Sequence, residues 1–68
     1  MLLKVGSRGE NVKAVQSVLG LTADGIFGKG TETHVRAFQE LNGLGVDGLV
    51  GNGTWEALGL LDTDITSI

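Results

Sequence analysis

The sequence has 68 residues but no cysteine, no proline and no tyrosine, and it has only one histidine, one tryptophan and two phenylalanines. Without cysteine the chain can form neither a disulfide nor a thiolate zinc site, and it has no thiol nucleophile. No apolar run is long enough for a membrane-spanning helix or a signal peptide. Because so short a chain buries only ~60% of its unfolded surface, we expect one small domain.

The chain also lacks a large excess of charge of either sign. Five lysines and arginines face eight acidic residues, and two of these acids, Asp62 and Asp64, stand near the C-terminal end. A nearly neutral body lacks the basic surface that binds a phosphate backbone or an anionic membrane. We therefore expect no nucleic acid and no membrane insertion. A helix-turn-helix interpretation is further weakened because the third predicted helix begins without residues that read base edges.

Glycine is abundant, with 12 residues, and its spacing reveals an internal repeat. The segment DGIFGKGT at 24–31 aligns with DGLVGNGT at 47–54, an offset of 23 residues. The same offset pairs Gln16 with Gln39, and it relates Val12 to Val35 and Leu58. The chain therefore divides into three units, at 1–23, 24–46 and 47–68.

Each unit is expected to form a glycine-rich turn followed by a short helix. In the first unit, Ser7 and Glu10 have the spacing of a capping box, and Gly20 is placed to end the helix in a left-handed conformation. In the second unit, Gly30 takes the capping position and Gly43 ends the helix. A shorter third helix follows from apolar residues at 55, 58 and 61.

These patterns predict an all-α fold, a small three-helix bundle made of glycine-rich turn-plus-helix repeats. The domain is expected over residues 1–61, and residues 62–68 are expected to be a flexible C-terminal tail or the start of a linker. The apolar residues of the turns, at 26–27 and 49–50, should fill the space between the helices. The predicted helix contribution to the core is Val12, Val15, Val35, Phe38, Leu41, Trp55 and Leu58.

The two Asp-Gly pairs are predicted to be turns that the aspartate closes on itself, with Gly25 and Gly48 at positive φ. Two other interpretations of Asp24 and Asp47 are open to consideration. A pair of carboxylates could cleave a glycosidic bond, and a dockerin-like repeat could bind calcium. A calcium loop needs several oxygen ligands at alternate positions, however, and each loop here has one carboxylate. We expect no metal and no cofactor.

Groups for catalysis are equally scarce. His34 falls on the polar side of the second helix, and neither a second histidine nor a cysteine is present to complete a metal site. Ser7 has no base beside it that would make it a nucleophile. We therefore expect a binding module and not an enzyme.

The ordered motifs resemble those of the peptidoglycan-binding-like domain, a three-helix module of many bacterial and bacteriophage cell-wall hydrolases. The resemblance runs from about Leu3 to Leu60, although the loop at 20–23 is shorter than in many members. The motifs that carry it are GxxGxxVxxxQxxL at 6–19, DGxFGxxT at 24–31, VxxFQ at 35–39, and DGxVGxxTWxxL at 47–58.

The resemblance implies a monomer that binds bacterial peptidoglycan, through its glycan strand or its stem peptides, and targets an attached hydrolase. It places the protein in the cell wall or periplasm. With no leader visible, delivery by phage lysis machinery or within a secreted protein is expected, and a phage endolysin fits best. The alternative is a structural module of the same fold that docks a protein partner in a virion, a spore coat or a cell envelope.

Because aromatic residues are few, the ligand is expected in a shaped groove and not on a stacking platform. Exposed backbone beside the turn glycines could bond to stem-peptide amides, and Arg8, Lys29 or Arg36 could meet a carboxylate. Phe27 is either a core residue or a groove wall, and the two glutamines either hold a backbone group or touch the ligand. The expected ligand-binding residues are Asp24, Gly25, Phe27, Gly28, Thr31, Arg36, Gln39 and Trp55.

Overall fold

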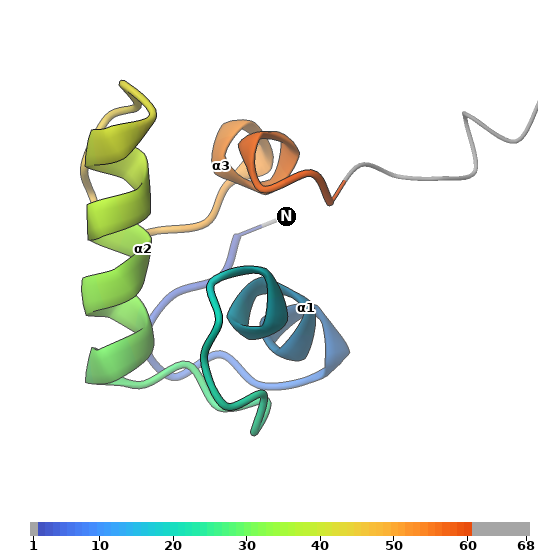
Figure 1. Ribbon diagram of the computed structural model, residues 1–68. Helices are drawn as coiled ribbons and strands as arrows, with labels where there is room; N and C mark the ends of the chain where they lie inside the picture. The colour runs from blue at the N-terminus through green and yellow to red at the C-terminus, as the bar shows by residue number, and fades with distance from the viewer. Residues whose placement is uncertain (1, 61–68) are drawn as a thin grey trace, which may run out of the picture.

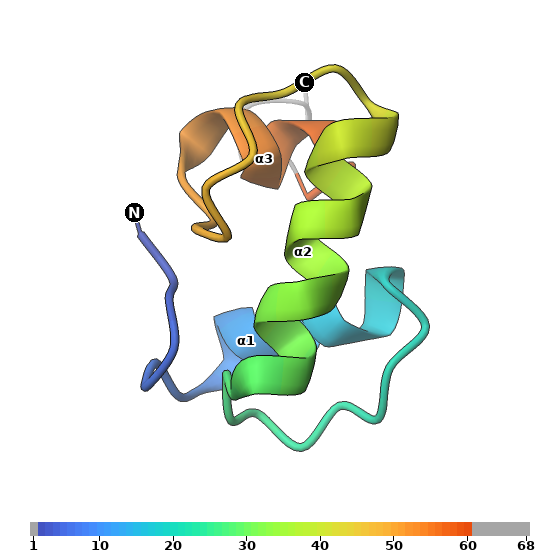
Figure 2. The same ribbon diagram turned by 90° about the vertical axis from the view of Figure 1, so that its left-hand side faces the viewer.

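Three helices form the body of the molecule in the computed structural model, which describes residues 2–60. They are α1 (Glu10–Val18), α2 (Lys29–Leu41) and α3 (Asn52–Ala57). The helix α2 runs along one side, with α1 beside its N-terminal half and α3 beside its C-terminal half (Figure 1, Figure 2). The described residues form isolated bridges but no strand, so the predicted all-α class is confirmed. The predicted tail at 62–68 lies outside the described residues.

The N-terminal segment passes between α1 and α3 (Figure 1) and ties the two Asp-Gly turns together. Leu3 and Val50 exchange two backbone hydrogen bonds of 2.9 Å. Further along, Gly6 donates to the Phe27 carbonyl and Phe27 donates to the Ser7 carbonyl, both at 2.9 Å. One extended segment therefore holds the turn of the second unit and the turn of the third.

The core takes buried hydrophobic residues from α1, from α2, from the segments between the helices and from the C-cap of α3. Val12, Val35 and Leu58, which the repeat relates to one another, are all buried, and Phe38 and Trp55 pack against the core while remaining partly exposed. The buried hydrophobic residues are Leu3, Val12, Val15, Phe27, Val35, Val50 and Leu58. None of the helices in the described part of the chain is long and apolar enough to cross a membrane.

Leu41 was predicted to belong to the core, and that prediction is wrong. Its side chain is 85% exposed. The buried residues of α2 are Thr31, Val35 and Gln39, which follow a spacing of four. At 3.6 residues per turn, Leu41 lies about 120° around the helix from Val35 and faces solvent.

The predicted capping box at the start of α1 is also wrong. The N-cap residue is Gly9, at φ 127°, and no side chain caps the helix. The Ser7 hydroxyl instead accepts a hydrogen bond of 3.0 Å from the Lys4 backbone N–H, closing a turn before the helix. Glu10 is the first residue of α1, where its negative charge interacts favourably with the positive end of the helix dipole.

The second helix begins earlier than predicted, whereas the helix ends match the prediction. The N-cap of α2 is Gly28, so Gly30 lies within the first turn and does not cap. Gly20 and Gly43 have φ values of 77° and 70°. Each follows its helix in the left-handed conformation that a side chain disfavours, and the last carbonyls of the helix accept hydrogen bonds from the chain that follows.

Candidate ligand-binding surface

The most highly connected polar side chain of the first unit is that of Gln16, which is 2% exposed. Its Nε2 lies 3.0 Å from Asp24 Oδ1, 3.0 Å from the Ile26 carbonyl and 3.1 Å from Thr31 Oγ1. Its Oε1 accepts from the Gly25 backbone N–H at 2.9 Å. Two amide hydrogens serve three acceptors, so one hydrogen is shared. This single side chain joins α1, the turn that follows and the first turn of α2.

Gln39 makes the same connections one repeat later. Its Nε2 lies 2.9 Å from Asp47 Oδ1, 2.9 Å from the Leu49 carbonyl and 3.1 Å from Thr54 Oγ1. Its Oε1 accepts from the backbone N–H groups of Asp47 and Gly48 at 3.1 and 3.0 Å. We call these two arrangements, centred on Gln16 and Gln39, the glutamine latches. Of the two interpretations of these glutamines, the structure shows the one in which each side chain holds backbone groups of the turn.

Each aspartate closes its own turn, as predicted. Asp24 Oδ1 accepts from the Ile26 backbone N–H at 2.9 Å, and Asp47 Oδ1 accepts from the Leu49 N–H at the same distance. The intervening glycines, Gly25 and Gly48, have φ values of 78° and 75°, which confirms the predicted left-handed conformation. The oxygen that receives the turn hydrogen bond is the one that the glutamine holds.

These hydrogen bonds stabilise the ionised form of both carboxylates. The backbone N–H of Ile26, and then the amide of Gln16, lower the pKa of Asp24 below its ordinary value. For Asp47 the corresponding donors are Leu49 and Gln39, and the charge of Arg36 makes a smaller contribution to the lowered pKa. Both carboxylates lie at the surface, so each turn presents a fixed negative charge to solvent.

A basic side chain lies over each turn glycine, a feature that the sequence analysis did not predict for either unit. A Cβ added to Gly25 would lie 3.2 Å from Lys13 Cε, and one added to Gly48 would lie 3.0 Å from Arg36 Nε. Lys13 and Arg36 are 23 residues apart, so the repeat itself was the signal that relates them. The absence of a glycine side chain leaves room for a basic side chain over each turn.

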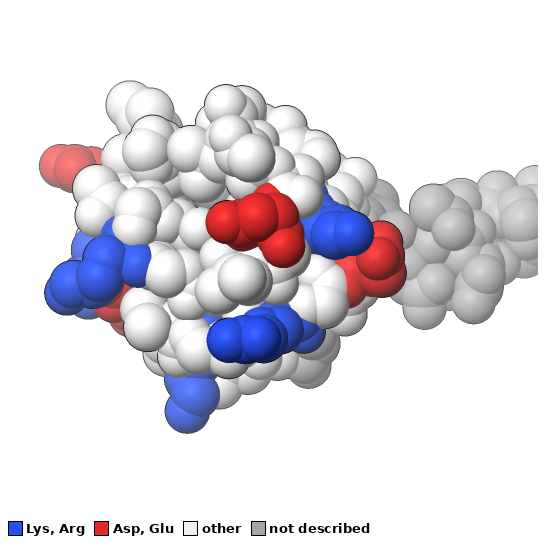
Figure 3. Space-filling model, turned by 90° about the horizontal axis from the view of Figure 1, so that it is seen from below, with Lys and Arg blue, Asp and Glu red and all other residues white. Residues whose placement is uncertain are grey.

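Charges of both signs alternate around these turns. Lys13 Nζ lies 3.5 Å from Glu10, and Arg36 Nη2 lies 3.6 Å from Glu32, which also pairs with Lys29 at 3.8 Å. The surface seen from below carries both basic and acidic groups among uncharged residues, and some groups of opposite charge lie side by side (Figure 3). A surface of this kind suits short-range contacts with a ligand that carries both amino and carboxyl groups.

The structure divides the eight expected ligand-binding residues into an inner and an outer group. Phe27 is 1% exposed and belongs to the core, so of its two interpretations the core role is the one observed. Thr31 and Gln39 are buried in the latches, and Gly25 is buried beneath Lys13. The residues that a ligand can reach are Asp24 and Arg36, which are exposed, and Gly28 and Trp55, which are partly exposed.

The remaining reactive groups do not converge on a site. His34 is exposed, and its Nδ1 lies 2.9 Å from the Gly30 carbonyl of its own helix. Within residues 2–60, no group of three or more His, Cys, Asp or Glu side chains is placed to hold a metal ion. The described residues form a small helical domain built on two equivalent latched turns.

The family model described as "Putative peptidoglycan binding domain" matches residues 8–58. The match covers most of the chain, and the chain therefore belongs to this peptidoglycan-binding family. None of the curated proteins matches it. The family assignment agrees with the repeated motifs, because the matched range contains both glutamine latches and all three helices.

Three solved structures show the same fold. A fused Zn-dependent amidase/peptidase/peptidoglycan-binding domain-containing protein from Clostridium acetobutylicum is 37% identical, with a TM-score of 0.84, and aligns with 100% of this chain and 33% of its own. The N-terminal domain of SleB is 40% identical, with a TM-score of 0.83, over 87% and 89% of the two chains. The Burkholderia AP3 phage endolysin is 38% identical, with a TM-score of 0.81, over 91% and 27%.

Proposed function

We propose that this domain binds peptidoglycan without cleaving it and holds an attached hydrolase at the bacterial cell wall. The observation that carries the proposal is the family match over residues 8–58. The chain spans only 33% of the amidase/peptidase protein and 27% of the endolysin. In both relatives most of the chain lies outside the region that aligns with this domain.

Attachment would act through effective concentration. A tethered hydrolase meets its substrate repeatedly without a new diffusive encounter, which raises the rate of cleavage even when the binding module has modest affinity. A phage endolysin is the parent protein that we propose, and the 38% identity to the Burkholderia AP3 phage endolysin supports this choice. The domain would then work in the cell wall as a monomer.

The chemistry of the accessible residues fits the stem peptides of peptidoglycan. Each latched turn offers a fixed carboxylate, from Asp24 or Asp47, that can accept hydrogen bonds from peptide amides or pair with a free amino group. Lys13 and Arg36 can pair with the carboxylates of the stem. Because the latches hold both turns in place, little conformational entropy is lost when a ligand binds.

A sedimentation assay on purified, protein-free sacculi tests the proposal. The domain should pellet with the sacculi, should remain in the supernatant without them, and should release no sugar or peptide. A control with sacculi digested by a muramidase should lose the pelleted protein. If the domain stays in the supernatant with intact sacculi, wall binding is refuted and a protein-docking role becomes the better explanation.

A further inference from the structure

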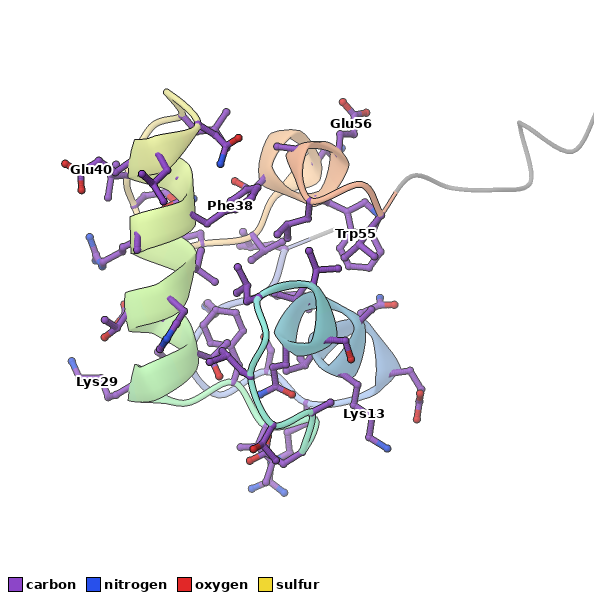
Figure 4. All side chains as sticks on the ribbon, in the orientation of Figure 1. Lys13, Lys29, Phe38, Glu40, Trp55 and Glu56 are labelled. Carbon is purple, nitrogen blue, oxygen red and sulfur yellow. The ribbon has the colours of Figure 1, made fainter. Side chains whose placement is uncertain are left out.

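The chain has a single tryptophan, Trp55. It is partly exposed, and its ring lies at the surface between α3 and α1, where it packs against the hydrophobic core (Figure 4). The backbone of Trp55 is fully engaged, since its N–H donates to the Gly51 carbonyl and its carbonyl accepts from Leu60. The backbone of Trp55 is therefore held by hydrogen bonds, and its ring is held by packing against the core.

The indole N–H of Trp55 donates no hydrogen bond within the described part of the chain, although buried indole N–H groups usually find a partner. All buried side-chain nitrogen and oxygen atoms among the described residues are hydrogen-bonded. The indole nitrogen is therefore not buried and can reach solvent. A rigid aromatic ring with an accessible donor at its edge can hold a ligand that has both an apolar face and an acceptor.

Other partly buried apolar residues pack against the same core as Trp55. Leu19 and Leu60 are partly buried and pack against the same core. The nearest labelled charged side chains point elsewhere, with Glu56 projecting above α3 and Lys13 below α1 (Figure 4). Neither of these two charged side chains points toward the Trp55 ring.

We propose that Trp55 is a contact for the glycan strand, an inference that rests on the proposed function. The apolar face of an N-acetylated sugar ring would pack on the exposed part of the indole, and the acetamido carbonyl would accept from the indole N–H. Stem peptides, which carry charged groups, match the charged side chains of the latched turns better than they match a neutral indole ring. Phe38 offers no equivalent, because it lies between α2 and α3 and has no donor (Figure 4).

Intrinsic fluorescence tests the inference directly, because the chain has one tryptophan and no tyrosine. Glycan strands freed of their peptides should shift the emission to shorter wavelength and protect the indole from quenching by iodide. Free stem peptides should do neither. An emission spectrum that does not respond to glycan strands, or that responds equally to stem peptides, overturns the proposal.

A substitution separates ligand contact from packing. Trp55→Phe keeps a ring in the core but removes the N–H, and we expect roughly fivefold to tenfold weaker binding to sacculi, the scale of one hydrogen bond. Phe38→Leu, the matched change at a partly buried aromatic residue, should leave binding unchanged. Unchanged binding by a folded Trp55→Phe variant contradicts the contact.

The two hypotheses fail in different ways. If the unmodified domain does not pellet with sacculi, the proposed function is wrong. If the domain pellets with sacculi but glycan strands do not change the tryptophan emission, only the proposed glycan contact is wrong. Thermal unfolding followed by circular dichroism shows whether each variant is folded, and the fluorescence titration needs no variant at all.

Discussion

Gln39 Nε2 and Asp47 Oδ1 lie 2.9 Å apart across the loop that joins α2 to α3. The backbone carbonyl of the same glutamine accepts from Leu44 N–H at 2.8 Å, which closes the C-terminal end of α2. One residue thus ends a helix with its backbone and shapes the next turn with its side chain. Gln16 has the same two roles in the first unit. Its backbone carbonyl accepts a hydrogen bond of 2.8 Å from the Leu21 N–H, and its side chain holds Asp24.

Removing either glutamine amide should destabilise the domain strongly. Gln16→Met and Gln39→Met retain most of the side-chain volume but leave buried N–H groups without a partner, which costs about 1–3 kcal/mol for each group. Gln39 accepts from two backbone N–H groups and Gln16 from one. We therefore expect a larger loss of unfolding free energy for Gln39→Met, measured by urea denaturation.

The control for the glutamine variants is Glu40→Met, which places the same side chain at an exposed neighbouring position. It should change the free energy of unfolding by no more than about 0.5 kcal/mol. Equal stabilities for all three variants would show that the latches contribute little to the fold.

Alanine at the turn glycines should also be costly. Gly25→Ala and Gly48→Ala force an L-residue into the left-handed region, a cost of about 1–2 kcal/mol. The new Cβ of Gly48→Ala would meet Arg36 Nε at 3.0 Å, whereas that of Gly25→Ala would meet Lys13 at 3.2 Å. The Gly48 variant should therefore have the lower melting temperature.

Gly30→Ala is the control for these turn variants. Gly30 lies in the first turn of α2, and a Cβ there would meet nothing within 4 Å. Alanine is a better helix former than glycine, so this change should leave the melting temperature unchanged or raise it. If Gly30→Ala lowered the melting temperature as much as Gly25→Ala, the cost at Gly25 could not be assigned to its positive φ.

The repeat explains how much of this architecture could be predicted from the sequence. Two copies of one motif predicted that Gln16 and Gln39 share a role and that the glycines beside Asp24 and Asp47 adopt positive φ. The partners of the glutamines could not be derived, because the acceptors include the carbonyls of Ile26 and Leu49, which leave no trace in residue type.

Other features were beyond sequence analysis for different physical reasons. The pairing of Leu3 with Val50 joins residues far apart in the chain through backbone groups alone. The exposure of Leu41 depends on which face of α2 packs inward, and a short amphipathic pattern permits more than one choice. The sequence analysis placed Trp55 both among the core residues and among the ligand-binding residues, and the partly exposed ring that packs against the core is compatible with both.

Stability should depend on pH through Asp24 and Asp47. Both carboxyl groups have a lower pKa in the folded protein than in the unfolded chain, so the folded state favours their ionised form. Their contribution to the free energy of unfolding is fully present above the pKa of the unfolded chain, near pH 4. It is lost as the pH falls through the lower pKa values of the folded protein. Melting temperatures between pH 7 and pH 2 should therefore decline at the acidic end.

The double variant Asp24→Asn with Asp47→Asn isolates this effect. Its amide oxygens can still accept the turn hydrogen bonds from Ile26 and Leu49, but they do not titrate. The difference in melting temperature between the protein and this variant should be constant at neutral pH and should shrink below about pH 4. A difference that is independent of pH would show that these carboxylates do not link folding to protonation.

Substitutions of Lys13 and Arg36, which lie over the turns, can separate an effect on stability from an effect on binding. Lys13→Met and Arg36→Met keep a long side chain over Gly25 and Gly48 but remove the charge. Because both side chains are about half exposed and their ion pairs are at the surface, each change should alter the free energy of unfolding by no more than about 0.5 kcal/mol. The apolar stem of either side chain is what covers the glycine.

Binding should respond differently from stability. If the latched turns meet the carboxylates of stem peptides, the double variant Lys13→Met with Arg36→Met should pellet less with sacculi at low salt. The difference from the unmodified domain should narrow as salt is added, because salt screens exposed charges. Glu56→Gln, a charge change on α3, is the control and should bind normally. Full binding by the double variant at every salt concentration would exclude Lys13 and Arg36 as contacts for the carboxylates of the stem peptides.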